Sequence, residues 1–341
     1  MNGVLSAEDS ALLDLLGLAK RRGYRFVTPT PATHARVLAR QDRRRARSIE
    51  DVLGWNLPFE AGDIEDEELV DCLRKASALE GDIILRSRFR ISSLHDQLYL
   101  HSSYPTESKD SVFLGPDSYR FADLIQMELQ ACRPRGGCRI ADIGTGAGVG
   151  AVVASAFCNR PHVFATDINP LAVRLARINV IAAATNADIF QGFGLDGVAG
   201  PLDLVTINPP YIIDDRNRTY RNGGRMRGSE VSLDLAGIAL ASLAPGGRLI
   251  LYTGSAIVGG HDALRAALGE AAERHECQMR YREVDPDVFG EELDRPQYVD
   301  VDRIAVVAAV MTRAYLSDRT VSAPIRARGS AFPSHHGEKD E

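Results

Sequence analysis

Residues 111 to 314 alternate between two hydrophobic patterns. Short apolar runs occur in CRIADIG, HVFATD, ADIFQG, LDLVTIN and GGRLILYTG, and segments of helical period such as LAVRLARINVIAAAT and SEVSLDLAGIALASLA separate them. Strand-like runs that alternate with helix-like segments are typical of βαβ units on a parallel sheet. Two last runs, QMRYREV and RIAVVAAVMT, predict strands that extend this sheet. The pattern therefore predicts an α/β fold for this part of the chain.

The first 110 residues follow a different pattern. Leucines recur at helical spacing from Ser6 to Lys20, and Ser6 is a candidate N-cap. In GDIILRSRFRISSLHDQLYLHSS, residues alternate with period two and LHDQ predicts a turn, so this segment is expected to form a β-hairpin. Helices followed by a hairpin predict a smaller α+β domain of winged-helix-like type. A structural cap with a solvated, charged face is the alternative.

Charge is distributed unevenly in this N-terminal region. Residues 20–47 contain ten Lys or Arg and one acid, whereas residues 48–73 contain nine acids and no base. Arg86, Arg88 and Arg90 are expected on one face of a strand, because side chains alternate with period two. The net charge of −6 argues against coating nucleic acid through bulk charge. A local basic track formed by these arginines could still bind phosphate.

The 341 residues are long for one domain. We expect an N-terminal domain at residues 1–110, an α/β domain at residues 111–314, and a disordered tail at residues 315–341 that is rich in Ser, Pro, Arg and His. No apolar run reaches the length of a membrane span and no signal-peptide pattern is present, so a cytoplasmic location is expected. The five cysteines show no metal-ligand or disulfide spacing, which predicts reduced thiols and no metal site: Cys72, Cys132, Cys138, Cys158 and Cys277.

The run ADIGTGAGVG ends the first strand of the α/β domain and contains Asp142, Gly144, Gly146 and Gly148. Glycines at a strand end let the backbone turn sharply and approach a ligand closely, because no Cβ intervenes. The second strand ends at Asp167, where an acid can accept hydrogen bonds from the ribose diol of NAD or S-adenosylmethionine. The carboxylate of Asp142 would repel a pyrophosphate but suits an amino group and a sulfonium. The pattern therefore favours S-adenosylmethionine.

The run LVTINPPYI places Asn208, Pro209, Pro210 and Tyr211 directly after a strand. Proline lacks an amide hydrogen and has a fixed φ, so two prolines end the strand. The side-chain oxygen of Asn208 and a backbone carbonyl held by proline could accept both N–H groups of a planar amine and localise its lone pair. Tyr211 could stack on the planar group. The alternative is a strand stop whose tyrosine packs on the core.

Together, ADIGTGAGVG, FATDINPLAV and LVTINPPYI resemble class I S-adenosylmethionine-dependent methyltransferases with an NPPY motif. Residues 111 to about 314 look most like the HemK-type glutamine methyltransferases that modify release factors. They are also similar to small-domain rRNA methyltransferases that act on guanine and to amino-methylating adenine DNA methyltransferases. The resemblance implies a Rossmann-like methyltransferase sheet and S-adenosyl-L-methionine as cofactor. It implies a macromolecular substrate, first a protein glutamine amide and alternatively an exocyclic amine of an rRNA or DNA base.

The resemblance also assigns roles to individual positions. The three glycines of the loop would surround the methionine moiety and Asp167 would hold the ribose. The cofactor-binding candidates are Asp142, Gly144, Gly146, Gly148, Asp167, Phe193 and Asn208. The catalytic candidates are Asn208, Pro209, Pro210 and Tyr211, which would orient the acceptor. Phe113, Asp117 and Tyr119, in FLGPDSYRFADLI, would lie near the cofactor.

Two segments depart from the pattern of the glutamine methyltransferases. Their Ser-Asp pair, which holds the adenine amine, is replaced by QGFG at residues 191–194, and the basic N-terminal region does not look like their helical bundle. The loop at residues 213–230 follows the NPPY motif and is expected to act as a lid that contacts phosphate or carboxylate, or else to be merely solvated. It carries Arg216, Arg218, Arg221, Arg225 and Arg227.

Two rival functions belong to other classes. A non-catalytic nucleotide-binding scaffold would have no need of the intact NPPY motif. A dinucleotide oxidoreductase is disfavoured by Asp142 and by the lack of residues suited to hydride transfer.

Overall fold

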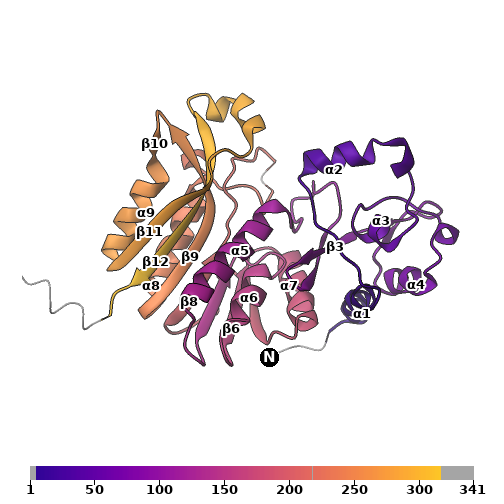
Figure 1. The fold of residues 1–341 in the computed structure, drawn as a ribbon, viewed down its shortest axis with the longest axis horizontal. Coiled ribbons are helices and arrows are strands. Elements are labelled where there is room, and N and C mark those ends of the chain that lie inside the picture. Colours follow the sequence, from indigo (N-terminus) through magenta and orange to yellow (C-terminus); the bar gives the residue numbers. More distant parts are fainter. Residues whose placement is uncertain (1–4, 217, 316–341) are drawn as a thin grey trace, which may run out of the picture.

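The computed structural model describes residues 5–216 and 218–315, and Figure 1 shows its ribbon. The chain begins with helices that lie to one side of a larger sheet domain (Figure 1). These helices are α1 (Ala7–Arg21), α2 (Pro31–Leu38), α3 (Ile49–Leu53) and α4 (Glu67–Lys75). The hydroxyl of Ser6 accepts a hydrogen bond of 3.0 Å from the amide of Asp9, which confirms the predicted N-cap of α1.

Two short antiparallel pairs follow these helices. They are β1 (Leu79–Glu80) with β2 (Arg86–Ser87), and β3 (Phe89–Leu94) with β4 (Gln97–Ser102). The second pair is the predicted hairpin, and it turns at His95, which has a φ of +51°. The mixture of helices and strands in this N-terminal part agrees with the expected α+β composition, and its winged-helix character stays a prediction.

The rest of the chain forms one twisted sheet in the strand order β11-β12-β9-β8-β5-β6-β7, with β10 paired to β9. Neighbours from β7 to β9 run parallel, whereas β11, β12 and β9 pair antiparallel. The strands are β5 (Arg139–Ile143), β6 (His162–Asp167), β7 (Ala187–Gln191), β8 (Leu202–Ile207), β9 (Leu243–Val258), β10 (His261–Asp262), β11 (Cys277–Asp285) and β12 (Arg303–Arg313). This confirms the predicted α/β fold with a parallel-dominated, Rossmann-like sheet.

Helices cover both faces of the sheet. Along β5, Ile140 belongs to one hydrophobic core and Ala141 to the other, as expected when successive side chains point to opposite faces. The first core includes α5 (Pro116–Ala131), α6 (Val149–Ser155) and α7 (Pro170–Ala182), and the second includes α8 (Glu230–Ser242) and α9 (Ala263–Arg274). Their bounds place the glycine loop and the NPPY motif at the carboxyl ends of β5 and β8.

Asn179 joins the N-terminal part to the sheet domain. Its side chain is fully buried on α7 and exchanges hydrogen bonds of 2.8 and 2.9 Å with the amide and carbonyl of Leu100 in β4. The same side chain donates 2.9 Å to the carbonyl of Ala147 in the glycine loop. The hairpin is therefore fastened to the cofactor-side loop through one amide.

The expectation that Arg86, Arg88 and Arg90 share one exposed strand face is wrong. Arg86 belongs to β2 and Arg90 to β3, so the chain leaves one strand and enters another between them. Arg90 is only 3% exposed, and its Nε donates 2.8 Å to the carbonyl of Gly54. Burial lowers the pKa of Arg90 to about 10. Its guanidinium lies 5.6 Å from the ring centroid of Phe26, inside the N-terminal part and not on a track.

The expectation of five reduced cysteines is also corrected, because the structure joins Cys138 and Cys158 by a disulfide. The amide of Gly137 donates to the carbonyl of Asn159 and the amide of His162 donates to that of Cys138, so the two chain segments lie side by side. This proximity arises from the fold and leaves no spacing pattern in the sequence.

Across the described residues, no group of three or more His, Cys, Asp or Glu is arranged to hold a metal ion. None of the helices in the described ranges is long and apolar enough to cross a membrane. The predicted disordered tail lies outside the described residues, apart from Tyr315.

Candidate active site

A cavity of about 1070 Å³ opens at the carboxyl ends of β5, β6 and β8. The glycine loop and Asp167 line it on one side and the NPPY motif lines it on the other. Residues 30–32, at the start of α2, complete its rim together with Asp285 at the end of β11 and residues 287–289 and 291–292 after it. In an open α/β sheet, this end of the strands is where ligands bind. The predicted site residues therefore line one cavity, with the exception of Gly148, which is absent from the lining and faces Ala176 and Val180 of α7.

The glycine loop borders open space. Gly144, Gly146 and Gly148 have φ angles of +65°, +54° and +84°, a region that favours glycine. A Cβ built on Gly144 or Gly146 would meet no atom within 4 Å. The loop therefore presents bare backbone to the cavity.

Both carboxylate oxygens of Asp142 accept hydrogen bonds from other residues of the protein. Its Oδ2 accepts hydrogen bonds from the hydroxyl of Thr145 at 2.6 Å and the amide of Ala151 at 3.0 Å, and its Oδ1 accepts from the hydroxyl of Thr206 at 2.8 Å. It is 2% exposed, and this burial raises its pKa to about 6. Through these contacts Asp142 holds the glycine loop against the sheet. Direct contact between Asp142 and a cofactor stays a prediction.

Asp167 ends β6 beside the glycine loop. Its Oδ2 accepts 2.9 Å from the amide of Gly146 and its Oδ1 accepts 2.9 Å from the amide of Asn169. Burial raises the pKa of this carboxyl. Each carboxylate oxygen can accept more than one hydrogen bond, so these two contacts leave acceptor capacity toward the cavity.

Two apolar side chains flank Asp167 in the cavity wall. Ile168 is 53% exposed and Phe193 is 46% exposed, although both are large and apolar. Exposed apolar groups inside a cavity are typical of ligand sites. Sequence reasoning missed Ile168; its signal was an apolar residue directly after the acid that ends the strand.

Asn208 directly follows β8 and lines the cavity. Within the described part of the chain, its side chain makes no hydrogen bond, so its amide oxygen and nitrogen remain available. Pro209 and Pro210 follow in irregular backbone, as expected of residues that stop a strand.

Tyr211 is packed more tightly than an open stacking surface. It is 7% exposed, and its hydroxyl donates 2.7 Å to Oδ2 of Asp117 at the start of α5. Its ring lies against Gly254 of β9 and makes an edge contact with Phe289 at 5.9 Å between centroids. The alternative in which this tyrosine packs on the protein is thus partly realised.

The three residues expected near the cofactor, just before and at the start of α5, do not all line the cavity. Phe113 and Asp117 line the cavity as expected. Tyr119 is absent from the cavity lining, and its hydroxyl accepts 3.0 Å from the amide of Thr28 in the N-terminal part. The expectation that Tyr119 lies near the cofactor is therefore not supported.

Each of the five arginines in the loop at residues 213–230 has a carboxylate partner. The pairs are Arg216 with Glu107 at 4.0 Å, Arg218 with Asp214 at 2.5 Å, Arg221 with Glu292, Arg225 with Glu230 at 2.5 Å and Arg227 with Asp300. The loop therefore contributes little free positive charge to the cavity rim.

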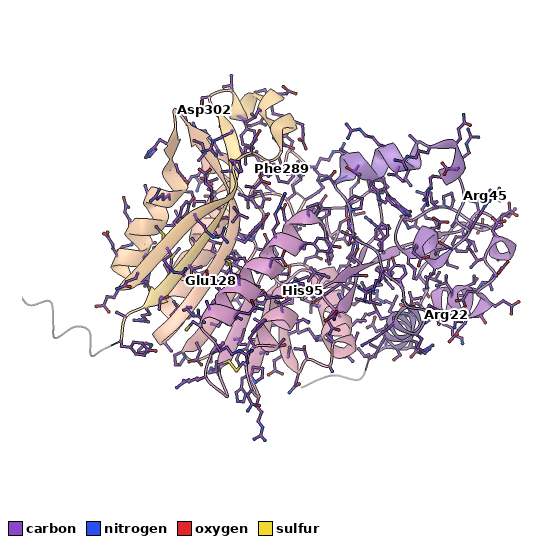
Figure 2. The ribbon with its side chains drawn as sticks, in the orientation of Figure 1. Arg22, Arg45, His95, Glu128, Phe289 and Asp302 are labelled. Atoms are coloured by element: carbon purple, nitrogen blue, oxygen red, sulfur yellow. A yellow bond between two sulfur atoms is a disulfide. The ribbon has the colours of Figure 1, made fainter. Side chains whose placement is uncertain are left out.

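The same loop is fastened to the segment between β11 and β12. The amide of Ile213 donates 2.8 Å to the hydroxyl of Tyr298, and Arg295 donates 2.6 Å to the carbonyl of Ile213. Phe289, labelled in Figure 2, belongs to this segment. Sequence reasoning missed this wall, although its signal was a long irregular stretch between two strands.

The methyltransferase small domain family matches residues 125–278. A release factor glutamine methyltransferase from Deinococcus radiodurans is 32% identical over 138 residues, which is 38% of this chain and 50% of that protein. A ribosomal RNA small subunit methyltransferase C from Erwinia tasmaniensis is 22% identical over 149 residues, covering 42% and 41%. The chain thus spans about half the length of the curated relatives it matches.

Among solved structures, a T. thermophilus 16S rRNA methyltransferase with AdoMet and guanosine covers 74% of this chain and 63% of its own, with 14% identity and a TM-score of 0.42. The cavity geometry and the sequence matches agree on the α/β domain. Over this domain the chain is similar to class I S-adenosylmethionine-dependent methyltransferases of the methyltransferase small domain type.

Proposed function

We propose that the chain transfers a methyl group from S-adenosylmethionine to a planar nitrogen, and that the acceptor is a protein glutamine side-chain amide. One observation carries the proposal: the unpaired side chain of Asn208 and the bare glycine loop line the same cavity. A donor held by the loop would therefore share one space with an acceptor nitrogen held at Asn208.

The residues on the cofactor side suit S-adenosylmethionine. Gly144 and Gly146 leave room for the methionine moiety, and Asp167 has acceptor capacity for the ribose hydroxyls. Ile168 and Phe193 offer two apolar surfaces for the adenine ring, in place of the Ser-Asp pair of related enzymes. When bound, this cofactor supplies an electrophilic methyl group.

The residues on the acceptor side suit an amide. The side-chain oxygen of Asn208 can accept one N–H of the substrate, and a carbonyl of the proline pair can accept the other. Both contacts draw the nitrogen lone pair out of conjugation and aim it at the donor. The nitrogen can release its proton to water after the methyl group arrives, so no general base is required.

The charges around the cavity favour a protein over RNA. Phosphate binding requires free cations. The loop arginines are already paired with carboxylates; Arg218, for example, is paired with Asp214, and Arg227 with Asp300. A neutral glutamine amide makes no such demand. We assign recognition of the acceptor's surroundings to the N-terminal domain at residues 1–110, because the start of α2 reaches the cavity rim.

An rRNA base amine is the second candidate, and a different observation favours it. Arg36, Arg40, Arg44 and Arg47 are exposed, and within the described ranges their side chains form no ion pair. These four could hold phosphates beyond the cavity. Either acceptor fits the cytoplasmic setting that the sequence predicts.

Methyl transfer into a cell lysate tests the proposal. The purified chain is incubated with methyl-labelled S-adenosylmethionine, and the products are treated separately with ribonuclease and with protease. We expect the label to survive ribonuclease and to appear as methylated glutamine after protein hydrolysis. Label that is released by ribonuclease would replace the glutamine proposal with the RNA candidate.

A further inference from the structure

One carboxylate connects three segments of the cavity wall. Asp117 is the second residue of α5, and each of its oxygens accepts a hydrogen bond from a different tyrosine. The hydroxyl of Tyr211 lies 2.7 Å from Oδ2, and the hydroxyl of Tyr252, in β9, lies 2.9 Å from Oδ1. The side chain of Asp117 is 18% exposed, so solvent competes only weakly for these contacts.

Arg120 completes this cluster. Its Nη1 lies 3.5 Å from Oδ1 of Asp117, and its Nη2 donates 2.9 Å to Oδ2 of Asp285 at the end of β11. Arg120 thus bridges Asp117 of α5 and the end of β11. The two oxygens of the Asp117 side chain each accept from one phenol, so one side chain restrains both tyrosines.

The ring of Tyr211 is buried in a hydrophobic cluster with Ile212 and Tyr298. The ring also lies against the backbone of Gly254, and the edge contact with Phe289 limits tilting. None of these apolar contacts holds the hydroxyl end, so the bond to Asp117 restrains where the long axis of the ring points. Burial, together with the negative charge of Asp117, raises the pKa of Tyr211 far above its usual value, so the phenol keeps the proton that it donates.

We propose that Asp117 is a positioning residue. Its hydrogen bond to the Tyr211 hydroxyl orients the tyrosine ring so that the ring can stack on the planar group that carries the acceptor nitrogen. The inference rests on the proposed methyl transfer at Asn208. It extends that function, because Asp117 touches neither the acceptor nor the methyl group in this role. Tyr252 donates to the same carboxylate but lies outside the cavity lining. A change at Tyr252 therefore tests the structural role of the carboxylate and not contact with the acceptor.

A double-mutant cycle tests the role of Asp117. Asp117→Asn should lower kcat about tenfold or more, while the affinity for S-adenosylmethionine, measured by calorimetry, stays within about twofold. Tyr211→Phe should lower kcat by a similar factor, and the double variant should be no worse than either single variant. Tyr252→Phe, which removes an equivalent bond from the same carboxylate, should leave kcat within about twofold.

A measurement that needs no activity separates this inference from the proposed function. In protein labelled with 3-fluorotyrosine, the resonance absent from Tyr211→Phe identifies Tyr211, and it should move or broaden in Asp117→Asn. Additive losses of kcat in the cycle, or an unchanged Tyr211 resonance, would overturn the positioning role even if glutamine is methylated. If the wild type methylates no glutamine, the proposed function fails, and the resonance alone decides whether Asp117 orients Tyr211.

Discussion

The backbone of Gly254 lies so close to the ring of Tyr211 that a Cβ atom built on Gly254 would come within 2.2 Å of the ring's Cδ2. No side chain larger than hydrogen fits between β9 and this ring. We therefore expect Gly254→Ala to displace Tyr211 and to lower kcat about tenfold or more, with cofactor affinity retained. Steady-state kinetics with calorimetry checks this.

Gly237 is the matched control for that substitution. It lies within α8, and a Cβ built on it would meet no atom within 4 Å. Gly237→Ala should leave kcat unchanged and stabilise the protein slightly, by about 0.5–1 kcal/mol, because alanine is the better helix former. Equal kinetic effects of the two variants would contradict the close packing at Tyr211.

Asp167→Ala should weaken the binding of S-adenosylmethionine at least tenfold, because the ribose hydroxyls would lose a charged acceptor. The substitution also removes the acceptor for the amide of Gly146, so thermal unfolding should be measured alongside calorimetry. Asp234→Ala, at an exposed position of α8, is the control and should bind as the wild type does. Undiminished affinity in Asp167→Ala, or tighter binding of NAD than of S-adenosylmethionine, would argue against the proposed cofactor.

Asn208→Ala should reduce turnover by about 100-fold or more, since a positioned hydrogen-bond partner of the reacting group is lost. Cofactor affinity should remain near the wild-type value, because Asn208 is assigned to the acceptor. Asn186→Ala, at an exposed position before β7, provides the control. Turnover of Asn208→Ala within a few-fold of wild type would mean that the NPPY motif only stops the strand.

Asp142 should make the protein less stable as the pH rises. Burial raises its pKa to about 6, whereas an unfolded aspartate titrates near about 3.9. Between these values the folded chain keeps a proton that the unfolded chain has released, so the free energy of unfolding falls with rising pH and levels off above about pH 7. The total change is on the order of 3 kcal/mol.

Urea unfolding of the wild type and Asp142→Asn across pH 4 to 8 isolates this contribution. Asparagine does not titrate, whereas Asp167, whose pKa is also raised, titrates in both proteins, so the difference between them reports chiefly on Asp142. The stability advantage of the wild type over the variant should therefore shrink from about pH 4 to about pH 7 and then stay constant. An advantage that grows over this range would show that the folded state favours the ionised carboxylate.

The strands and the two ligand-side motifs were predictable because their signals are local. The apolar runs locate β5 to β8, and the paired prolines after Asn208 end β8, whereas β9 extends beyond its predicted run at both ends, from Leu243 to Val258. The parallel order of the sheet then brings Asp167 and Asn208 to one edge. This much follows from periodicity and the chemistry of proline and glycine.

Burial and pairing of charged residues were not predictable in the same way. Arg90 looks like an exposed strand residue, but the packing of the hairpin against Gly54 places it inside the N-terminal part. In the sequence, Arg221 and Arg227 look like free cations of a lid. In the structure they pair with Glu292 and Asp300, which lie some seventy residues later in the chain. Such partners depend on tertiary contacts that leave no period or spacing in the sequence.

The link through Asn179 limits how this protein could be recombined with its relatives. An N-terminal part taken from another methyltransferase would have to offer a backbone amide and carbonyl where Leu100 now lies, or the buried amide would lose two of its three contacts. Leaving a buried amide unpaired destabilises a protein by about 1–3 kcal/mol. Here the unpaired amide would be the side chain that also donates to the carbonyl of Ala147 in the glycine loop. The N-terminal part and the sheet domain are therefore not freely interchangeable, and a chimaera built at residue 110 should include a compensating change at Asn179.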